Sequence, residues 1–330
     1  MGAPSRLSLA VETGAVDLPE SGRIAVFMPR VDTDLSVLPA ERVHVVTPLK
    51  PDFDHFAARG FDCAVAPEGR YATSVVCVPR AKPLARVLIA QATHVTDGPV
   101  IVDGEKTDGV ESILKECRRH AAVGAPLSKA HGKIFTIEAG SDFSKLTARD
   151  GVEIADGFVT VPGVFSADGI DPASRWLADC LPGTLGAHVV DLGGGWGYLA
   201  ARVLERDSVT RLDLVEADHS ALDCARRNVA DPRAVFHWAD VTTWQPDTRA
   251  DSVVMNPPFH TGRIADPDLG RAFIATAARA LKPSGTLWMV ANRHLLYEAT
   301  LTQRFRHVDE IAGNARFKIL RARHPSRKPG

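Results

Sequence analysis

Two short segments of the chain hold residues whose types and spacing suit chemistry on a nitrogen atom. The first runs from Asp191 into a glycine-rich turn, Gly193–Gly197, and the second is Asn256-Pro257-Pro258-Phe259. The Asn256 side-chain oxygen and the Pro257 main-chain carbonyl can together accept both N–H groups of an amine on a planar ring. Such an amine is a poor nucleophile because its lone pair is delocalised into the ring. Acceptors that hold it favour the charge that develops during attack, so the second segment predicts group transfer to this kind of nitrogen.

The other two residues of the tetrapeptide support the same chemistry. Pro258 restricts the backbone and stiffens the loop. Phe259 offers an aromatic face on which a base can stack once it has left its helix. We therefore predict that the catalytic residues are Asn256, Pro257, Pro258 and Phe259.

The glycine-rich turn predicts a cofactor site. Without side chains at Gly193, Gly195 and Gly197 the backbone can approach a ligand closely. Asp191, at the end of an apolar run, can hold an ammonium group directly or through water. The strict dinucleotide motif Gly-x-Gly-x-x-Gly is not satisfied, but its relaxed form ending in alanine fits from Gly195 to Ala200. The turn alone therefore leaves a nicotinamide or flavin site open.

Acidic residues also follow the next two expected strands. Glu216 ends the second strand, where its carboxylate can accept hydrogen bonds from both hydroxyls of a ribose. Asp218 is better explained as the N-cap of the following helix. Asp240 follows the third strand and suits a contact to an adenine amino group, although it could equally cap its own loop.

The C-terminal half alternates between strands and helices, which predicts an α/β fold with a parallel sheet covered on both faces. Strands are expected at 187–192, 211–216, 234–238, 252–255 and 286–291, with helices at 173–181, 198–205, 220–229 and 269–281. Two more strands, at 305–311 and 316–320, are separated by Gly313-Asn314, which predicts an antiparallel hairpin at one edge. The expected result is a seven-stranded, mostly parallel sheet.

The N-terminal half carries a fainter copy of this plan. Strands are expected at 23–28, 44–47, 63–66, 74–78 and 99–102, with helices at 83–92 and 109–120, the second capped by Asp108. Residues 29–32 stand where a glycine turn should follow the first strand, and residues 78–82 stand in place of Asn-Pro-Pro-Phe. We interpret residues 1–130 as a degenerate copy of a catalytic domain that spans 131–330. A separate α/β domain of unrelated origin is the alternative.

The segment between the halves is rich in glycine, threonine, phenylalanine and valine. Residues 135–137 and 158–161 are expected to pair as an extra ribbon. The stretch Pro162–Asp171 follows and leads through a helix to the glycine turn. Its backbone, including Phe165, is therefore expected to lie close to the cofactor pocket.

Composition narrows the class of protein. With 330 residues, 45% hydrophobic and 24% charged, the chain is typical of a soluble protein of two domains. No apolar run approaches the about 20 residues of a membrane helix, and the N-terminus lacks a secretory apolar core. We expect a cytoplasmic protein with no membrane partner.

Five scattered cysteines form no Cys-x-x-Cys pair, so neither a metal site nor a disulfide framework is expected. The net charge of −1 argues against a generally basic coat, although basic residues gather near the C-terminus.

These features together resemble the bacterial ribosomal RNA guanine-N2 methyltransferases, two-domain class I enzymes with Rossmann-like domains. The resemblance covers most of the chain and is carried by Pro162–Phe165, Asn256–His260 with Gly262, Val290–Asn292 and Arg316–Lys318. In the first half, Pro79–Lys82 and Gly104–Gly109 resemble the degenerate first domain of that family. The chain departs from the pattern at Gly194 and Trp196 and in the residues after Asn292.

The resemblance implies S-adenosyl-methionine as the cofactor and a guanine amino group of ribosomal RNA, free or within a ribosomal subunit, as the acceptor. The sulfonium of such a donor is already activated, so no strongly basic residue is needed. The residues expected to bind the cofactor are Phe165, Asp191, Gly193, Gly195, Gly197, Glu216, Asp240 and Asn256. Those expected to reach RNA are His260, Arg263, Arg293, Arg321 and Arg323. The first domain would help to fold the protein and to hold RNA, and the internal duplication makes a monomer adequate.

Alternatives remain at this level. Asn-Pro-Pro-Phe does not separate guanine N2 from adenine N6 or from the side-chain amide of a protein glutamine. A non-enzymatic RNA-binding or ribosome-assembly protein could keep the same fold. The intact set of Asp191, Gly193, Gly195, Glu216 and Asn256 argues against that last reading.

Overall fold

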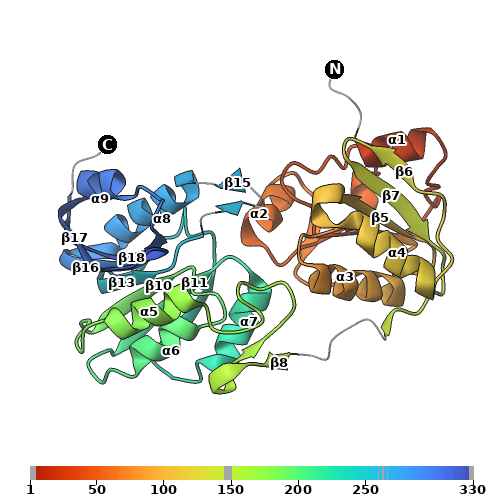
Figure 1. Ribbon diagram of the computed structural model, residues 1–330. Helices are drawn as coiled ribbons and strands as arrows, with labels where there is room; N and C mark the ends of the chain where they lie inside the picture. The colour runs from red at the N-terminus through yellow and green to blue at the C-terminus, as the bar shows by residue number, and fades with distance from the viewer. Residues whose placement is uncertain (1–4, 145–150, 259, 262–263, 266, 327–330) are drawn as a thin grey trace. The chain divides into compact units, whose positions relative to one another are not determined.

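The computed structural model describes residues 5–144, 151–258, 260–261, 264–265 and 267–326. They fall into two compact units, Met1–Gly151 and Val152–Gly330, which run from red to yellow and from green to blue in Figure 1. Each unit is built around its own sheet of seven strands with helices against it. The predicted α/β class is confirmed. No helix among the described residues is both long and apolar enough to cross a membrane.

The sheet of the first unit has the strand order β3-β2-β1-β4-β5-β7-β6. The first five of these strands are parallel, while β7 is antiparallel to both β5 and β6. The strands are β1 Ile24–Phe27, β2 Val43–Val46, β3 Asp62–Ala64, β4 Thr73–Cys77, β5 Val100–Glu105, β6 Leu127–Lys129 and β7 Gly132–Ile137. The helices are α1 Arg6–Glu12, α2 Lys50–Ala58, α3 Lys82–Val95 and α4 Val110–His120, with 3-10 turns η1 Ala40–Arg42 and η2 Lys106–Asp108.

The sheet of the second unit has the order β12-β11-β10-β13-β16-β18-β17. Again five strands are parallel, and β18 runs antiparallel between β16 and β17. The strands are β10 His188–Leu192, β11 Arg211–Glu216, β12 Ala234–Trp238, β13 Ala250–Met255, β16 Leu281–Asn292, β17 Phe305–Gly313 and β18 Phe317–Pro325. The helices are α5 Pro172–Cys180, α6 Tyr198–Leu204, α7 His219–Asn228, α8 Pro267–Ala280 and α9 Glu298–Arg304. Small ribbons pair β8 Val152–Glu153 with β9 Val159–Thr160, beside the 3-10 turn η4 Ala155–Gly157, and β14 His260–Thr261 with β15 Ile264–Ala265.

The two sheets share one strand order when each is numbered from its own first strand. The predicted seven-stranded sheet with an antiparallel edge hairpin is therefore confirmed in the second unit, and the first unit has the same arrangement. The predicted boundary between residues 130 and 131 falls between β6 and β7, which pair with each other in the first sheet. The division between compact units lies at Gly151 instead.

Two local predictions were wrong. Residues 135–137 do not pair with 158–161, because β7 lies between β5 and β6 while β9 pairs with β8. Asp108 does not cap α4 either. It ends η2, and the N-cap position is held by Gly109 with φ +86° and no side-chain hydrogen bond.

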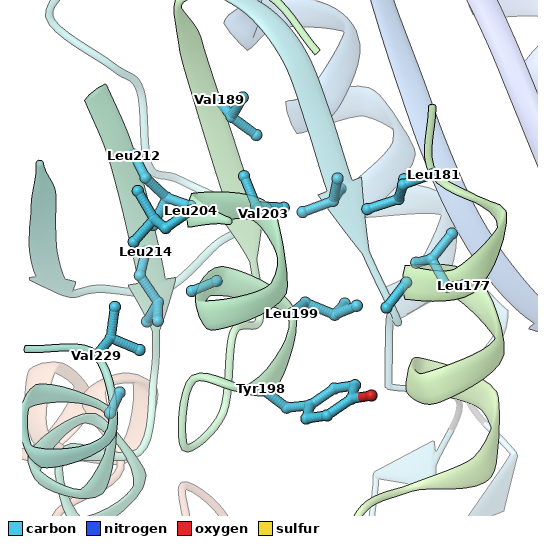
Figure 2. Close-up of a cluster of buried hydrophobic side chains, with 14 of the residues drawn as sticks. Leu177, Leu181, Val189, Tyr198, Leu199, Val203, Leu204, Leu212, Leu214 and Val229 are labelled. Carbon is cyan, nitrogen blue, oxygen red and sulfur yellow. The ribbon is translucent and has the colours of Figure 1, made fainter. Parts of the chain in front are cut away.

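The central strands of the second sheet are apolar because helices cover both of their faces. All five residues of β10 are buried. Val189 packs with α5, α6 and α7 on one face, while Val190 packs with α8 on the other. Figure 2 shows the first of these layers, with Leu177 from α5 and Leu199 from α6 pointing into one cluster beside β10 and β11. This packing fixes the carboxyl ends of the central strands, where the predicted site residues lie.

The first unit differs from the second directly after its first strand. Between β1 and β2 it has a loop and the turn η1, where the second unit has the glycine turn and α6. The loop is closed by Asp52 of α2, which is 2% exposed. Asp52 accepts a hydrogen bond from the Val31 backbone N–H at 3.1 Å and lies 3.2 Å from the Arg30 guanidinium. A paired carboxylate therefore closes the loop that follows the first strand of this unit.

Candidate active site

The predicted site residues of the second unit meet at a topological switch point. The chain leaves β10 toward β11 on one side, while β13 lies on the other side of β10. In open α/β sheets, ligands bind outside the carboxyl ends of strands at such a point. Asp191 is the fourth residue of β10, and Asn256 directly follows β13. The two predicted segments are thus brought to neighbouring strand ends.

The glycine turn is held in shape by the backbone. The Gly193 N–H donates to the Val215 carbonyl at 2.8 Å, and the Gly197 N–H donates to the Gly194 carbonyl at 3.0 Å. Gly193, Gly195 and Gly197 have φ of +71°, +55° and +94°, which disfavours any other residue. A Cβ on Gly197 would lie 2.7 Å from Val229, whereas a Cβ on Gly195 would meet nothing within 4 Å. Gly195 is therefore the position where the backbone faces open space that a ligand can use.

Asp191 is a buried carboxyl group to which the described residues give at most a weak contact from the Ala200 backbone N–H. It is 0% exposed, and neither of its oxygens has a hydrogen bond among the described residues. Burial, with the nearby negative charge of Glu216, raises the pKa of Asp191 to about 8. An unpaired buried polar group is costly, so its presence points to a ligand that supplies the missing donor.

A second buried aspartate in the same sheet shows the contrast. Asp213 of β11 is also 0% exposed, but it is fully paired. It forms hydrogen bonds with His188 at 2.6 Å and His237 at 2.9 Å and accepts one from Arg211 at 3.0 Å. Burial acts to raise the pKa of Asp213, yet these partners hold it well below its usual range. The protein can therefore satisfy a buried carboxylate in this sheet, and it leaves Asp191 unsatisfied.

Glu216 ties the glycine turn to the end of β11. Its carboxylate accepts hydrogen bonds from the Gly195 and Asp218 backbone N–H groups, each at 2.8 Å. Burial raises the pKa of Glu216 to about 6, against the effect of these donors. A carboxylate has further acceptor positions, so Glu216 can still receive ribose hydroxyls. The predicted N-cap is confirmed, since Asp218 accepts from the Ser220 N–H at 2.9 Å.

Asp240 follows β12 and closes its own turn. One carboxylate oxygen accepts from both the N–H and the hydroxyl of Thr242 at 2.8 Å. This is the loop-capping arrangement that was the alternative to an adenine contact, which stays a prediction.

Asn256 is oriented by two residues of the α5 N-terminus. Its Nδ2 donates to Asp171 Oδ2 at 3.0 Å and to Ser174 Oγ at 2.9 Å. Asp171 is itself fixed as the N-cap of α5, where it accepts the Ser174 N–H. With the amide nitrogen anchored in this way, the Asn256 side-chain oxygen and the Pro257 carbonyl have no hydrogen bond among the described residues. Within the described part of the chain, both predicted acceptors are thus left to a ligand amine.

Two cavities meet at this asparagine. The smaller, of about 40 Å³, lies against the glycine turn and is lined by Phe165, Asp171, Ser174, Gly193–Trp196, Tyr198, Leu199 and Asn256. The larger, of about 330 Å³, extends from Asn256 across the ends of β16 and β18 and is lined by Phe165, Asp171, Ala173, Asn256, Pro257, Val290–Asn292, Leu295, Tyr297, Arg316 and Phe317. The shared residues are Phe165, Asp171 and Asn256. A donor bound beside the turn and an acceptor in the larger cavity would therefore meet at Asn256.

Phe165, which is predicted to bind the cofactor, is largely exposed to solvent. The residue is 60% exposed, and its carbonyl accepts a hydrogen bond from the Trp196 indole at 2.9 Å. This bond joins the segment after β9 to the glycine turn, as the sequence indicated. Because Phe165 lines both cavities, it can contact either a cofactor or an acceptor.

The residues predicted to reach RNA are not brought together. Arg293 pairs with Glu310 at 2.8 Å and donates to the Asn314 carbonyl, so it braces the edge hairpin. Arg321 and Arg323 lie further along β18 and both pair with Asp309. Phe259 and Arg263 lie outside the described residues, as does the side chain of His260. None of these residues lines either cavity among the parts of the chain that the structure describes. Their contacts to RNA stay predictions.

The site residues predicted from the sequence did not include Asp171 and Ser174, the two residues that orient Asn256. Asp171-Pro172-Ala173-Ser174 carries the signature of a helix start, an N-cap aspartate followed by proline. That signal predicts α5 but not the contact from its first turn to a loop more than eighty residues away. Within the described ranges, no group of three or more histidines, cysteines, aspartates or glutamates is placed to hold a metal ion.

Comparison with known proteins agrees with this geometry. The family model described as Methyltransferase small domain matches residues 156–321. A ribosomal RNA small subunit methyltransferase C from Shewanella sp. (strain MR-4) is 30% identical over 264 residues, which are 76% of this chain and 77% of the relative. A ribosomal RNA large subunit methyltransferase G from Alcanivorax borkumensis is 36% identical over 170 residues, 50% of this chain and 43% of the relative.

Among solved structures, a T. thermophilus 16S rRNA N2 methyltransferase in complex with AdoMet and guanosine has the same two-unit fold. The superposition of the two structures has a TM-score of 0.77, and the sequences are 24% identical. The match covers 93% of this chain and 89% of the other chain.

Proposed function

The chain belongs to the family of bacterial ribosomal RNA guanine-N2 methyltransferases, and from this premise we propose that it methylates a guanine of ribosomal RNA. The methyl group comes from S-adenosyl-methionine and goes to the exocyclic N2 amine. One observation carries the proposal: the cofactor side and the acceptor cavity meet at Asn256. Its amide nitrogen is anchored, and its oxygen has no hydrogen bond within the described ranges. The acceptor cavity can hold a flat base.

The residues of the second unit fit the cofactor. The unpaired carboxyl of Asp191 can take its ammonium group, and the bare backbone at Gly195 allows close approach. Glu216 can take the ribose hydroxyls, as the sequence predicts. When bound, S-adenosyl-methionine supplies a methyl group on a sulfonium that needs no further activation.

The chain's own residues then orient the acceptor. The Asn256 Oδ1 and Pro257 carbonyl accept the two N–H groups of the guanine amine and aim its lone pair at the donor side. These fixed acceptors favour the positive charge that the nitrogen gains during attack. The proton on the nitrogen is lost to solvent afterwards, so the site needs no strong base. Asp171 and Ser174 act through Asn256 and are positioning residues.

The first unit is proposed to support folding and to hold RNA. Its α4 carries the exposed side chains Lys115, Arg118 and Arg119, which suit contacts to phosphates. It has no glycine turn after its first strand, and its loop there is closed by Asp52. We propose that the protein works as a monomer in the cytoplasm, because the second α/β unit is already part of the chain and because its proposed substrate is made there.

Transfer of labelled methyl to ribosomal subunits and to RNA that lack native methylation tests this function. Digestion to nucleosides should place the label in N2-methylguanosine for both or one of the two substrates. Label in methyladenosine would keep the mechanism and replace the substrate. No label in RNA, with measurable cofactor binding, would contradict the proposal and direct the search to protein acceptors.

Replacing Ser174 by alanine should slow the reaction modestly. The change removes one of two anchors of the Asn256 amide, and a hydrogen bond of about 1 kcal/mol corresponds to a rate loss of about two- to tenfold. The KM for S-adenosyl-methionine should change little, because Asp191 and Glu216 are untouched. The measurement is kcat for methyl transfer, with Ser208→Ala, an exposed serine of the turn before β11, as control. Equal rates for both variants would show that Asp171 alone orients the amide.

A further inference from the structure

The acceptor cavity contains a positive charge that the mechanism does not use. Among the described residues that line the 330 Å³ cavity, Arg316 is the one with a cationic side chain. It directly precedes β18 and lies at the end of the cavity opposite the strand that carries Asn256. Its chemistry is restricted, since a guanidinium only donates hydrogen bonds and does so in a planar fork.

The surroundings of Arg316 hold it in place without neutralising it. Its backbone N–H donates to the Asn314 side-chain oxygen at 2.7 Å, and its carbonyl accepts from the Arg293 N–H at 2.8 Å. Its guanidinium lies over the Phe317 ring, 5.2 Å from the centroid. The neighbouring arginines 293, 321 and 323 each pair with a carboxylate. No carboxylate in the described part of the chain pairs with Arg316, so its fork is available to a ligand.

The spacing between Arg316 and Asn256 suits a single base. Asn256 follows β13 and Arg316 precedes β18, with β16 between them. Two strand spacings are about 10 Å, which leaves room for one flat ring system between the two side chains. If the N2 amine lies at Asn256, the other end of the Watson–Crick edge of guanine points away from Asn256, toward the β18 side of the cavity.

We propose that Arg316 recognises the O6 edge of the acceptor guanine, an inference that rests on the proposed methyl transfer to N2. O6 and the adjacent N7 are both acceptors, and a fork of N–H donors on this pair is the commonest specific contact to guanine. Arg316 would contact the substrate base and thereby determine which base is methylated.

The same contact would exclude adenine. An adenine whose N6 amine lies at Asn256 presents C2–H at the far end of its Watson–Crick edge, where a guanidinium finds no acceptor. Asn292, at the end of β16, is another polar residue of the cavity lining, beside Asp171 and Tyr297. An amide can turn either its oxygen or its nitrogen to a ligand, so it does not separate the two bases. The tetrapeptide does not separate them either, so the cationic fork of Arg316 is the group we assign to this discrimination.

The test compares two acceptors in one RNA. The methylated guanine, once mapped, is replaced by 2-aminopurine, which keeps the N2 amine and N7 but lacks O6. The wild type should prefer guanine by about 10- to 100-fold in kcat/KM, as expected for a good contact to a base edge. Arg316→Ala should lose rate on guanine and bring this ratio close to one, and Arg316→Lys should give an intermediate ratio because it has lost the fork. Arg306→Ala, at an exposed position on β17, should keep the wild-type ratio.

The outcomes separate the two proposals. An unchanged ratio in Arg316→Ala overturns the assignment of Arg316 while leaving methyl transfer to N2 intact. An equal loss on both RNAs, with a weaker salt dependence of binding, would identify a phosphate contact and also overturns it. Absence of N2-methylguanosine with the wild-type protein is a different result, and it contradicts the proposed function itself. Circular dichroism and S-adenosyl-methionine affinity should match the wild type in every variant, because Arg316 does not line the cofactor side.

Discussion

Methyl transfer by an Asn256→Ala protein should fall by about 10²- to 10³-fold, the usual effect of removing one fixed polar group that stabilises developing charge. The variant loses the side-chain oxygen that accepts an amine hydrogen, while the Pro257 carbonyl remains. Rate constants should be measured under single-turnover conditions with saturating S-adenosyl-methionine, so that a change in cofactor affinity does not contribute. Gln245→Ala, which removes an exposed amide from a loop after β12, is the matched control and should keep the full rate.

An Asn256→Asp protein makes the test sharper. Aspartate keeps the shape and supplies oxygen acceptors, but one of them would face the Asp171 carboxylate, which now accepts from Asn256 at 3.0 Å. Two carboxylates at this distance repel each other, so the side chain should leave its place and the rate should be low. Full activity in Asn256→Asp would show that the anchored amide does not orient the acceptor. A rate above one tenth of wild type in Asn256→Ala would contradict the assignment of Asn256 as the main acceptor.

An Asp191→Asn protein should lose cofactor affinity and yet be more stable without cofactor. The carboxylate is expected to hold the ammonium group, and a charge-assisted hydrogen bond is worth about 1.5–3 kcal/mol, or roughly 10- to 150-fold in Kd. In the ligand-free protein the same group is buried, with no hydrogen-bond partner within the distance and angle limits of a hydrogen bond among the residues that the structure describes. A neutral amide of equal shape removes the free-energy cost of ionising the buried Asp191 carboxyl in the ligand-free protein. Calorimetric titration measures the first effect, and urea unfolding of the ligand-free protein measures the second.

The pH dependence of stability has a defined sign. Burial raises the pKa of Asp191 to about 8 in the folded protein, from the ordinary value of 3.8. Between these values the unfolded chain releases a proton that the folded protein keeps. The stability contribution is therefore fully present below about pH 4 and is lost as pH rises toward 8, by on the order of 6 kcal/mol at most. Asp191→Asn should remove most of this decline and leave a smaller part from Glu216, whose pKa is also raised.

Binding of S-adenosyl-methionine should show the complementary trend. Because the ammonium group needs the ionised carboxylate, the wild-type Kd should fall as pH rises from 6 to 8, with release of a proton on binding. Calorimetry in buffers of different ionisation enthalpy counts that proton. Asp213→Asn is the control, since it removes a carboxylate that is fully paired and should destabilise the protein. If Asp191→Asn unfolds as readily as Asp213→Asn, the carboxyl of Asp191 has a structural partner and the argument fails.

The sequence was most informative where one local pattern carries both structure and chemistry. The apolar strand before Asp191, the glycine turn and the strand before Asn256 are contiguous signals, and the structure has each of them within a residue or two of the predicted place. The mostly parallel sheet also followed from the alternation of strands and helices, whereas the order of its strands was not predicted.

Contacts between segments that are distant in the sequence could not be predicted from local patterns of this kind. β7 was expected to pair with a later segment, because apolar alternation shows that a strand exists but not which edge it joins. The anchors of Asn256 come from the first turn of α5, and that link depends on where α5 packs against the sheet. Arg321 and Arg323 were expected near RNA from their charge, yet the register of β18 carries them along the strand away from the cavity and beside Asp309.

The position of β18 between β16 and β17 has a consequence for the order of events during translation. The first sheet can close once Ile137 has left the ribosome, because β7 is the last of its strands to be made. The second sheet closes only after Pro325 has emerged, since β18, the last of its strands to be made, joins β17 to β16. Until residues 317–325 emerge, β16 presents an open edge, which a neighbouring chain could occupy. The nascent polypeptide should therefore carry a folded first half for some time while its catalytic half is still incomplete and inactive.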